Sequence, residues 1–531
     1  MLISLSQFLW GPPLEQYTSA YGIGAARHRE THGTIPRQLA SAAVRRICDF
    51  SGQVGSGLSY IEVAEKVSLA TLIAVMRMSH DPDTYKIFLS PGLASGCVEL
   101  MATVKEGGKT VPFSYEYGYL CFRILLFSLG ACILSRSGDS NLDKTINMMK
   151  DPRYGICLIS DLFSLRIAQR LVKLIPVPPQ PAECDWILGW GSSATPSRHD
   201  QIVSREQARK LIDMLWEDRI NFSQAMSSTF IPGLAGLLFL NWRYICLENT
   251  STNPNNSLLK QTCELQWRCQ LVIPTNQEDP AERITDHFWV STKFDPRKGD
   301  FFFNRSKDSR WILEAYIVRL APINLAMYDA LPLTMLHVLL QLVAPNLVTD
   351  VEDLLPSIFK VTLCRLWKAL REEECTYEPT ILCIALTFEQ FRTMFKSLRE
   401  NGISPPTIAR ILEELAQQSF LDLVASLFLS LDPNAEIDSK EDITNFNLIQ
   451  TTKAMIDELE MSTPSELAEI HFQDYAMAWH KTNHHFAHLQ HPIMISNGQA
   501  EHRLRENHYK ASLAVKLGIG NEGHIVGIVA D

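Results

Sequence analysis

The chain has 531 residues, of which 46% are apolar and 20% are charged. This apolar fraction is typical of a folded protein and excludes a chain that is disordered throughout. The 49 Lys and Arg residues against 59 Asp and Glu residues give a formal net charge of -10. That balance argues against a general nucleic-acid binder, because contacts with phosphates require surplus basic side chains.

Apolar residues recur three and four positions apart from Pro36 onward, between Pro, Gly, Asp and Asn residues, which predicts helices. In chain order, we predict them over residues 36–49, 59–79, 93–105, 114–135, 153–174, 204–225, 232–248, 308–319, 322–343, 349–371, 386–400, 405–417, 418–431, 441–461, 464–489 and 500–512. Only 265–273 and 287–294 alternate polar and apolar residues as strands do, and 265–273 fits a helix as well. The predicted fold class is all-α.

Composition divides the chain into five regions. They are a poorly ordered N-terminal segment (1–35), an N-terminal helical region (36–175), a linker or loop with Pro and Trp (176–200), a central helical region (201–434) with an irregular insert (249–308), and an acidic, His-rich C-terminal helical region (435–531). The N-terminal segment contains one short apolar stretch, Leu2–Trp10, which we interpret as an anchor.

The linker at 176–200 contains five prolines, which forbid a continuous helix. Its two tryptophans, Trp186 and Trp190, are our candidate partner-binding residues, because tryptophan is a common anchor in protein interfaces. The alternative is that the loop folds back and buries both rings.

The most membrane-like stretch, Tyr117–Ser135, contains Arg123. The uncharged remainder, Ile124–Leu134, is too short to span a bilayer. We therefore expect a buried helix and no membrane span. Twelve cysteines without a C-x-x-C pair indicate reduced thiols and an intracellular, cytoplasmic protein, with the nucleus as an alternative location. The N-terminus lacks the basic residues of a signal peptide.

Three segments share a helix, a short Gly/Pro turn and an apolar helix: Phe88–Met101, Phe230–Leu240 and Leu398–Leu415. The first two both contain Pro-Gly-Leu-Ala, at 91–94 and 232–235. We expect the glycine to end one helix in a left-handed cap and the proline to start the next.

In these turns the chain resembles the armadillo/HEAT class of helical repeats, whose units often carry a Gly-apolar-x-x-apolar turn before the last helix. The resemblance implies an irregular α-solenoid that binds partners along a groove. A globular multi-helix bundle is the alternative fold.

Three segments imitate ligand-binding loops. Thr103–Thr110 (TVKEGGKT) lacks the first glycine of a phosphate-binding loop and precedes Pro112, so we interpret it as a helix-terminating turn. Gly518–Gly523 (GIGNEG) has only eight residues after it, too few for a dinucleotide-binding unit. Asp432–Ile443 lacks the glycine and the final glutamate of a calcium loop. None predicts a catalytic or cofactor site.

Eight of the 15 histidines lie between 471 and 508. His480, His484 and His488 recur every fourth residue, a spacing that brings imidazoles to one metal on a helix. They lie away from the apolar stripe that contains Trp479, which indicates a solvated face. We therefore predict a non-catalytic scaffold for a peptide or protein partner, without a cofactor. The alternative is a zinc-dependent regulator or enzyme that uses these histidines.

Overall fold

The computed structural model describes residues 5–22, 37–51, 60–138, 141–151, 153, 159–175, 181–191, 199–248, 257–292, 306–323, 327–347, 349–372, 377–402, 404–429, 440–463 and 467. These residues are all-α, as predicted. Their only strands are the two short members of one hairpin, β1 (Lys105–Glu106) and β2 (Lys109–Thr110). The chain divides into two compact units, unit 1 (Met1–Gly299) and unit 2 (Asp300–Asp531). This division falls inside the predicted insert at 249–308, and the other predicted boundaries remain predictions.

Unit 1 contains α-helices and short 3-10 helices, written η. They are α1 (Leu5–Trp10), α2 (Leu14–Ala20), α4 (Arg37–Cys48), α5 (Tyr60–Lys66), α6 (Leu69–Arg77), η1 (Met78–His80), η2 (Pro82–Leu89), α7 (Leu93–Met101), η3 (Pro112–Ser114), α8 (Glu116–Arg136), α9 (Asn141–Lys150), α10 (Ile159–Leu174), α11 (Pro181–Leu188), α12 (Arg205–Glu217), α13 (Arg219–Ser228), α14 (Leu234–Glu248), α15 (Ser257–Gln270), η5 (Thr275–Gln277) and α16 (Glu278–Thr292).

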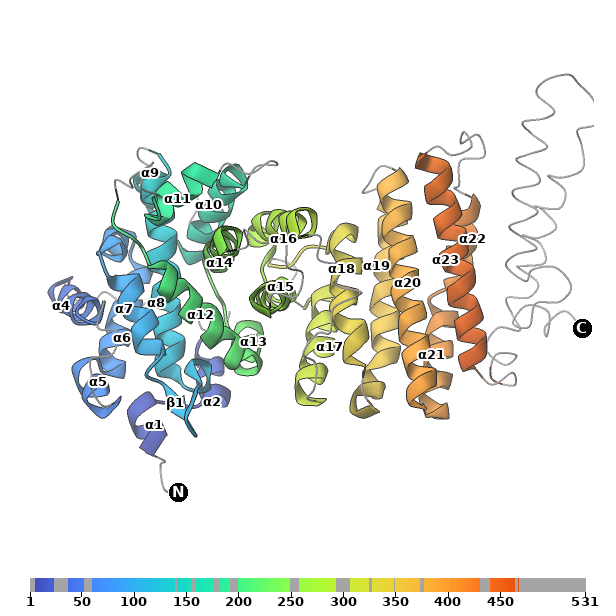
Figure 1. The fold of residues 1–531 in the computed structure, drawn as a ribbon, viewed down its shortest axis with the longest axis horizontal. Coiled ribbons are helices and arrows are strands. Elements are labelled where there is room, and N and C mark those ends of the chain that lie inside the picture. The colour runs from blue at the N-terminus through green and yellow to red at the C-terminus, as the bar shows by residue number, and fades with distance from the viewer. Residues whose placement is uncertain are drawn as a thin grey trace, which may run out of the picture. The chain divides into compact units, whose positions relative to one another are not determined.

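Helix α8 lies at the centre of unit 1, where it contacts α6, α7, α10 and α14 (Figure 1). Every residue from Glu116 to Leu134 is buried. A helix that is apolar on all sides needs cover of this kind. Among the described helices, α8 alone has the length and composition to cross a membrane, and 94% of its apolar window is buried inside the structure.

The charge in the middle of α8 has neutral hydrogen-bond partners and ring contacts. Arg123 Nη1 donates to the hydroxyl of Tyr119 at 2.9 Å and to the carbonyl oxygen of Phe230 at 2.8 Å. Its guanidinium carbon lies 5.8 Å from the ring centroids of Tyr119 and Phe127. Because a buried charge needs such partners, these contacts explain how α8 accommodates Arg123 in its buried face.

In the N-terminal segment, α1 lies within the apolar stretch that we interpreted as an anchor, whereas α2 differs from the prediction of poor order. Both helices dock onto α8. Trp10 packs edge-on against Tyr117, with ring centroids 5.0 Å apart. Tyr17 is 1% exposed and donates its hydroxyl to the carbonyl oxygen of Phe113 at 2.6 Å. The backbone N–H of Glu116 donates to Pro12 O at 2.9 Å. Burial of these aromatic side chains therefore gives a defined structure to residues that were predicted to be poorly ordered.

The Gly/Pro turns are formed in two ways. Gly402 has φ +72° and follows the end of α20 (Tyr377–Asn401), and Pro405 begins α21 (Pro405–Gln417), as predicted. At Gly92 and Gly233 the prediction is wrong: each glycine, with φ +81°, immediately precedes a helix rather than ending one. The preceding proline belongs to the turn, so left-handed backbone at the glycine redirects the chain into α7 or α14.

Neither predicted strand forms. Residues 265–270 belong to α15, and 287–292 belong to α16. The alternation of polar and apolar residues wrongly suggested strands, because the polar side of α15 is also covered, by α16. Gln270 Nε2 donates to Thr285 Oγ1 at 2.5 Å, and Gln266 Nε2 donates to the carbonyl oxygen of Ala281 at 3.0 Å. Polar residues with internal partners do not mark a solvent face.

Unit 2 contains a shorter series of helices. They are α17 (Ser306–Leu320), α18 (Leu333–Val343), η7 (Ala344–Asn346), η8 (Thr349–Leu354), α19 (Leu355–Glu372), α20 (Tyr377–Asn401), α21 (Pro405–Gln417), α22 (Phe420–Leu429) and α23 (Lys440–Ser462).

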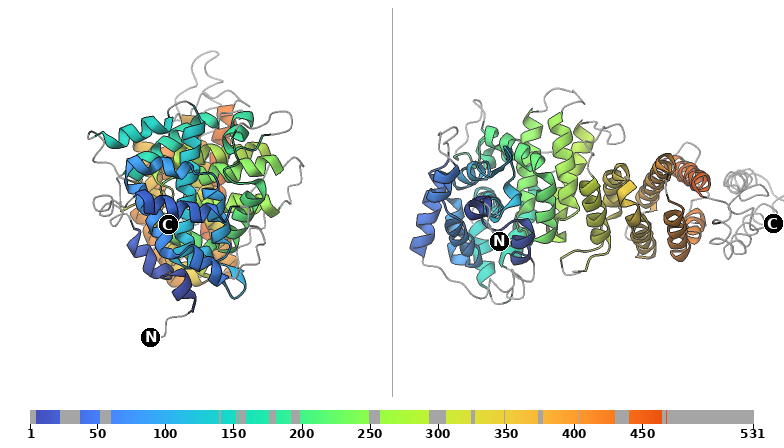
Figure 2. Two further views of the ribbon diagram at one scale, coloured as in Figure 1. Left: turned by 90° about the vertical axis from the view of Figure 1, so that its left-hand side faces the viewer. Right: turned by 90° about the horizontal axis from the view of Figure 1, so that it is seen from below.

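Alternate helices of unit 2 contact each other. Helix α19 packs between α17 and α21, and α20 packs between α18 and α23 (Figure 1 and Figure 2). Tyr316 of α17 shares a 2.9 Å hydrogen bond with Thr362 of α19, and Arg310 pairs with Asp353 at 2.7 Å. Because residue numbers rise together along both helices, α17 and α19 are parallel. The contacts define two layers, α17–α19–α21 and α18–α20–α23.

Candidate functional site

The predicted linker contains a helix, α11, that is tied to the rest of unit 1. Its proline, Pro181, occupies the first helical position, where the missing N–H has no intrahelical partner. Asp185 forms a bidentate ion pair with Arg243 of α14, at 2.7 and 2.8 Å. Arg170 of α10 pairs with Glu183. The prolines thus prevent one continuous helix across 176–200 but not this short one.

The two candidate tryptophans lie in different environments. Trp190 is 2% exposed, and its Nε1 donates to the carbonyl oxygen of Val203 at 2.7 Å. Trp186 is half-buried, with its ring 4.7 Å from that of His199. Trp190 therefore has no ring surface for a partner, as in the alternative in which the loop folds back. A partner-binding role stays a prediction that only Trp186 has the exposure to fulfil.

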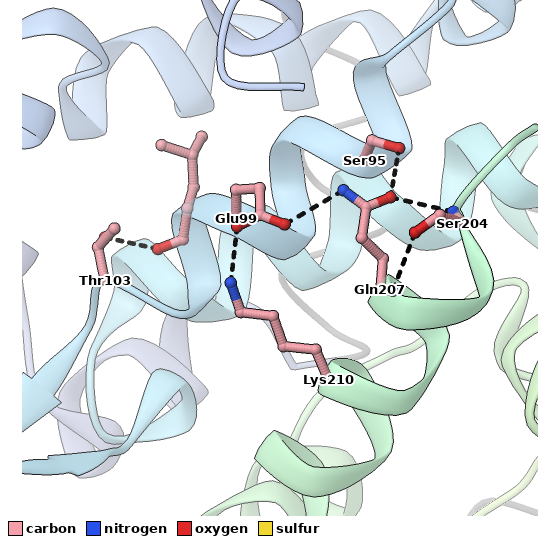
Figure 3. Close-up of polar contacts among 7 residues, drawn as sticks. Ser95, Glu99, Thr103, Ser204, Gln207 and Lys210 are labelled. Atoms are coloured by element: carbon pink, nitrogen blue, oxygen red, sulfur yellow. Dashed lines mark hydrogen bonds and ion pairs between the residues drawn. The ribbon is translucent and has the colours of Figure 1, made fainter. Parts of the chain in front are cut away.

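A buried polar cluster joins α7 to α12 (Figure 3). Glu99 of α7 is 8% exposed. Its Oε2 accepts from Lys210 Nζ at 2.6 Å, and its Oε1 accepts from Gln207 Nε2 at 3.2 Å. The amide oxygen of Gln207 accepts from Ser95 Oγ at 2.8 Å and from the backbone N–H of Ser204 at 3.1 Å.

The same glutamine completes the capping box that starts α12. Ser204 Oγ accepts from the backbone N–H of Gln207 at 3.1 Å, while the Gln207 side chain accepts from the backbone N–H of Ser204. Both carboxylate oxygens of Glu99 accept hydrogen bonds, and the side-chain amide of Gln207 uses both its oxygen and its nitrogen in hydrogen bonds. A carboxylate held in this way fixes one helix against another, and we assign the cluster a structural role.

A cysteine and a histidine meet between α14 and α16. Cys246 Sγ lies 3.9 Å from His287 Nδ1, which accepts from Trp242 Nε1 at 3.0 Å. Sequence reasoning missed this pair because the residues lie 41 positions apart. Burial raises the pKa of Cys246 to about 12. Burial, and to a smaller extent the nearby positive charge of Arg243, lowers the pKa of His287. The thiol is therefore protonated at neutral pH, which is unsuitable for nucleophilic catalysis.

The predicted ligand loops are placed as follows. Thr103–Thr110 contains the β1–β2 hairpin, with Gly107 and Gly108 at positive φ, so the expected helix-terminating turn is wrong beyond Thr103. Two consecutive left-handed residues are what a tight hairpin turn requires. His480, His484 and His488, the segment 518–523 and residues 432–439 of the segment 432–443 lie outside the described residues. Within the described part of the chain, no three His, Cys, Asp or Glu residues form a metal-binding group.

Helix α19 has one outward-facing row in unit 2, which we call the α19 row. It consists of Lys360, Cys364, Trp367, Lys368 and Arg371, and every other residue from Leu355 to Ala369 is buried except Ser357 and is therefore packed against neighbouring helices. The row carries three basic residues and no carboxylate. Its basic positions i, i+8 and i+11 share one face of a helix, a signal already present in the predicted helix 349–371 but not used.

Side-chain contacts fix this row against α21. Lys360 Nζ pairs with Glu414 Oε1 at 3.2 Å, and Trp367 Nε1 donates to the carbonyl oxygen of Gln418 at 2.8 Å. The Arg371 guanidinium carbon lies 5.4 Å from the centroid of the Trp367 ring. A tryptophan held at its edge and stacked by an arginine is a preorganised contact surface rather than a reactive group.

The α19 row is therefore an exposed contact surface, whereas the cluster of Glu99 and Gln207 holds two helices together. Compared with known proteins, the chain matches no protein-family model and no curated sequence.

Proposed function

We propose that this chain is an intracellular scaffold that binds a peptide or protein partner along a helical surface. The observation that carries the proposal is the α17–α19–α21 layer of unit 2, in which α19 packs between two helices and keeps one row exposed. Stacked helices that contact only their neighbours form long continuous surfaces, which helical-repeat proteins use for binding.

The same layer supports a relationship in architecture to armadillo/HEAT repeats. Helices α17 and α19 are parallel, and so are α19 and α21, since Lys360 pairs with Glu414 and Cys364 Sγ contacts Gln418 Oε1 at 3.0 Å. The left-handed glycine at 402 and the proline at 405 form the short turn expected between repeat helices. Unit 2 is the part of the chain to which we apply the repeat interpretation.

Binding without catalysis is favoured by the chemistry of the buried groups. The Glu99 carboxylate is neutralised by Lys210, the Cys246 thiol has a raised pKa, and burial lowers the pKa of His337 to about 4. A general base or nucleophile needs a pKa near the working pH and access to substrate. These residues lack that combination.

The thiols support a cytoplasmic location, with the nucleus as the alternative. The ten cysteines in the described part of the chain form no disulfide, and seven of them are buried. Buried thiols without a disulfide are typical of a reducing compartment. Imaging of a fluorescent fusion tests this proposal, and accumulation in the secretory pathway would contradict it.

Cross-linking mass spectrometry of the full-length chain, affinity-purified from its native cell type, tests the scaffold proposal. We expect a stoichiometric partner whose lysine-reactive cross-links reach Lys360 and Lys368 of the α19 row more often than Lys396, an exposed lysine of α20. A partner linked only to unit 1, or the absence of any stoichiometric partner, would contradict the proposal.

Trp186 is a second candidate contact, in unit 1. We expect Trp186→Ala to reduce recovery of a partner without changing the thermal unfolding of the chain. Trp190→Ala is the matched control, because it removes a buried ring and should lower the unfolding temperature. Equal partner recovery in the Trp186 variant and the unmodified chain would remove this residue from the proposed interface.

The alternative function, a zinc-dependent regulator or enzyme, is based on the spacing of His480, His484 and His488. It predicts about one zinc ion per chain in untagged protein, lost when His484 and His488 are changed to Ala. Elemental analysis that finds no zinc in the unmodified chain would reject it.

A further inference from the structure

Residues 5–22 of unit 1, which we call the strap, consist of α1 and α2 joined by residues 11–13. Figure 1 shows α1 at the edge of unit 1, and Phe8 on its outer side is 79% exposed. Fourteen residues, 23–36, separate the strap from α4 in the sequence. A stretch of that length can reach up to about 45 Å, so the strap can leave unit 1 without displacing α4.

The inward side of the strap has the anchor spacing of a helical peptide ligand. Leu14, Tyr17 and Tyr21 lie at positions i, i+3 and i+7, on one face of α2 and its C-terminal cap. Leu14 and Tyr17 are 7% and 1% exposed, and Trp10 at the end of α1 is 2% exposed. The strap contains one charged residue, Glu15, which is exposed. Its apolar side chains therefore point inward and its polar ones outward.

The surface beneath the strap, which we call the seat, is formed by η3 and the first turn of α8. The ring of Trp10 packs edge-on against that of Tyr117, with centroids 5.0 Å apart. Tyr17 stacks on Tyr119 at 4.9 Å, and Tyr21 contacts the same ring at 5.2 Å. Ring pairs at these distances add specific attraction to the burial of apolar area. The seat therefore favours a segment with aromatic anchors.

Polar groups fix the position of the strap on the seat. The Tyr17 hydroxyl donates to the carbonyl oxygen of Phe113 at 2.6 Å, and the backbone N–H of Glu116 donates to the carbonyl oxygen of Pro12 at 2.9 Å. The Tyr21 hydroxyl donates to the Glu116 carboxylate. A buried donor or acceptor that loses its partner is costly, so these bonds select a segment that places the same groups at the same positions.

We propose that the strap is an intramolecular ligand that covers the seat, and that the seat binds an amphipathic helical segment of another protein when the strap leaves. The fitting segment has large apolar or aromatic side chains at the positions of Leu14, Tyr17 and Tyr21, and few charges. Exchange of straps between two copies of the chain gains no contact, and the tether gives the strap an effective concentration in the millimolar range. A partner with stronger anchors gains contacts and displaces the strap.

Fluorescence polarisation of the full-length chain tests this inference, with a labelled peptide of residues 5–22 as the probe. The unmodified chain is compared with the double variant Trp10→Ala with Tyr17→Ala, whose own strap has lost two anchors. We expect the peptide to bind the double variant at least about tenfold more tightly, because a weakened strap competes less for the seat. A peptide with the same two alanines should bind neither chain.

Gln16→Ala is the matched control, because Gln16 is exposed on α2 and is not an anchor. It should leave the peptide affinity unchanged within about twofold. Tyr17→Phe is a milder variant, which removes only the hydroxyl that donates to Phe113 and keeps the ring on Tyr119. It should raise the peptide affinity about threefold. Circular dichroism melting of each variant verifies that the rest of the chain is folded.

Three results would overturn the inference: no binding of the peptide to the folded double variant at millimolar concentration, equal affinity for the double variant and the unmodified chain, or equal binding of the alanine peptide. A double variant that fails to fold, together with no gain of affinity in Tyr17→Phe, would show that the strap is part of the core.

A dimer of the unmodified chain that Trp10→Ala disperses would overturn the assignment to another protein and give the seat to a second copy. The inference goes beyond the proposed function, whose surface lies on unit 2. Because the peptide binds the seat and not the α19 row, the two proposals can fail separately.

Discussion

Unit 1 surrounds a central helix, whereas unit 2 arranges alternate helices in two layers. The difference follows from how apolar residues are distributed on the helices. Helix α8 is buried on every side over 19 residues from Glu116 to Leu134, so it needs neighbours all round. Helix α19 keeps a polar row and needs cover on its other sides only. The first arrangement buries polar groups inside the unit, and the second leaves a row of them exposed on its surface.

The largest expected effect comes from the buried ion pair of unit 1. Arg268 Nη2 lies 2.6 Å from Glu264 Oε1, and both side chains are at most 1% exposed. Removing Arg268 takes the nearer cation from the buried Glu264 carboxylate, which Arg219 Nε approaches only to 3.9 Å, so we expect Arg268→Ala to lower the free energy of unfolding by about 3–5 kcal/mol. Chemical denaturation of the full-length chain measures this change.

The exposed pair between Arg209 and Asp213 is the control for that experiment, with side chains 44% and 50% exposed. Arg209→Ala should change stability by about 0.5 kcal/mol or less. Similar losses in the two variants would contradict the distinction between buried and exposed pairs.

A smaller effect is expected at the glycines of the two Pro-Gly-Leu-Ala helices. A Cβ at Gly96 of α7 would collide with the backbone carbonyl oxygen of Ile47, whereas at Gly236 of α14 its nearest neighbour is Ile133 Cδ1 at 3.5 Å. We expect Gly96→Ala to destabilise unit 1 by about 1–3 kcal/mol. Gly236→Ala should be neutral or stabilising by up to about 1 kcal/mol, because alanine favours the helix. Thermal melting compares them, and equal effects would show that the α4–α7 contact is not close.

The pH dependence of unit 1 provides a further prediction. Burial raises the pKa of Asp218 to about 7, against hydrogen bonds from the backbone N–H of Phe113 and from Asn221 that lower it. The folded chain therefore holds this proton more tightly than the unfolded chain, and its stability falls as pH rises from about 4 to about 7.

Asp218→Asn keeps an acceptor for the Phe113 N–H, which lies 2.7 Å from Asp218 Oδ2, but removes the titration. We expect the slope of unfolding free energy against pH in this interval to change by up to about 1.4 kcal/mol per pH unit. Denaturation curves at several pH values measure it. Identical slopes in the variant and the unmodified chain would show that Asp218 does not titrate there.

The smallest effect concerns the solvent-facing surface of unit 2. Arg310 and Asp353 are 40% and 54% exposed, so Arg310→Ala should reduce the stability of unit 2 by about 0.2–1 kcal/mol. A reduction that persists at high salt would indicate that packing of the arginine stem, rather than charge, stabilises this surface.

The all-α class and most helix positions could be predicted, because a 3.6-residue period is a local property of the sequence. The predicted helix 405–417 coincides with α21, and the predicted helix 114–135 is close to α8. The predicted helix 322–343 begins only at Leu333, after Pro332. Helices α1, α2, α9, α11, α15 and α16 were missed, because several of them are short or are buried on their polar side.

The candidate site was less accessible to prediction. Trp186 and Trp190 look alike in sequence, yet Trp190 is buried and donates a hydrogen bond to the carbonyl oxygen of Val203, whereas Trp186 is only half-buried. The basic residues of the α19 row share a helical face, which a period argument can find. That α19 packs between α17 and α21 depends on contacts between residues far apart in the chain.

By itself, the sequence determined most of the helical segments, the turn at Gly402 and Pro405, and the burial of the apolar segment around Arg123, because each depends on neighbouring residues. The tertiary structure alone decided the docking of residues 5–22, the partners of the buried charges and the division between a central helix and two layers. Those features arise from contacts between distant segments, where the residues on both sides must fit at once.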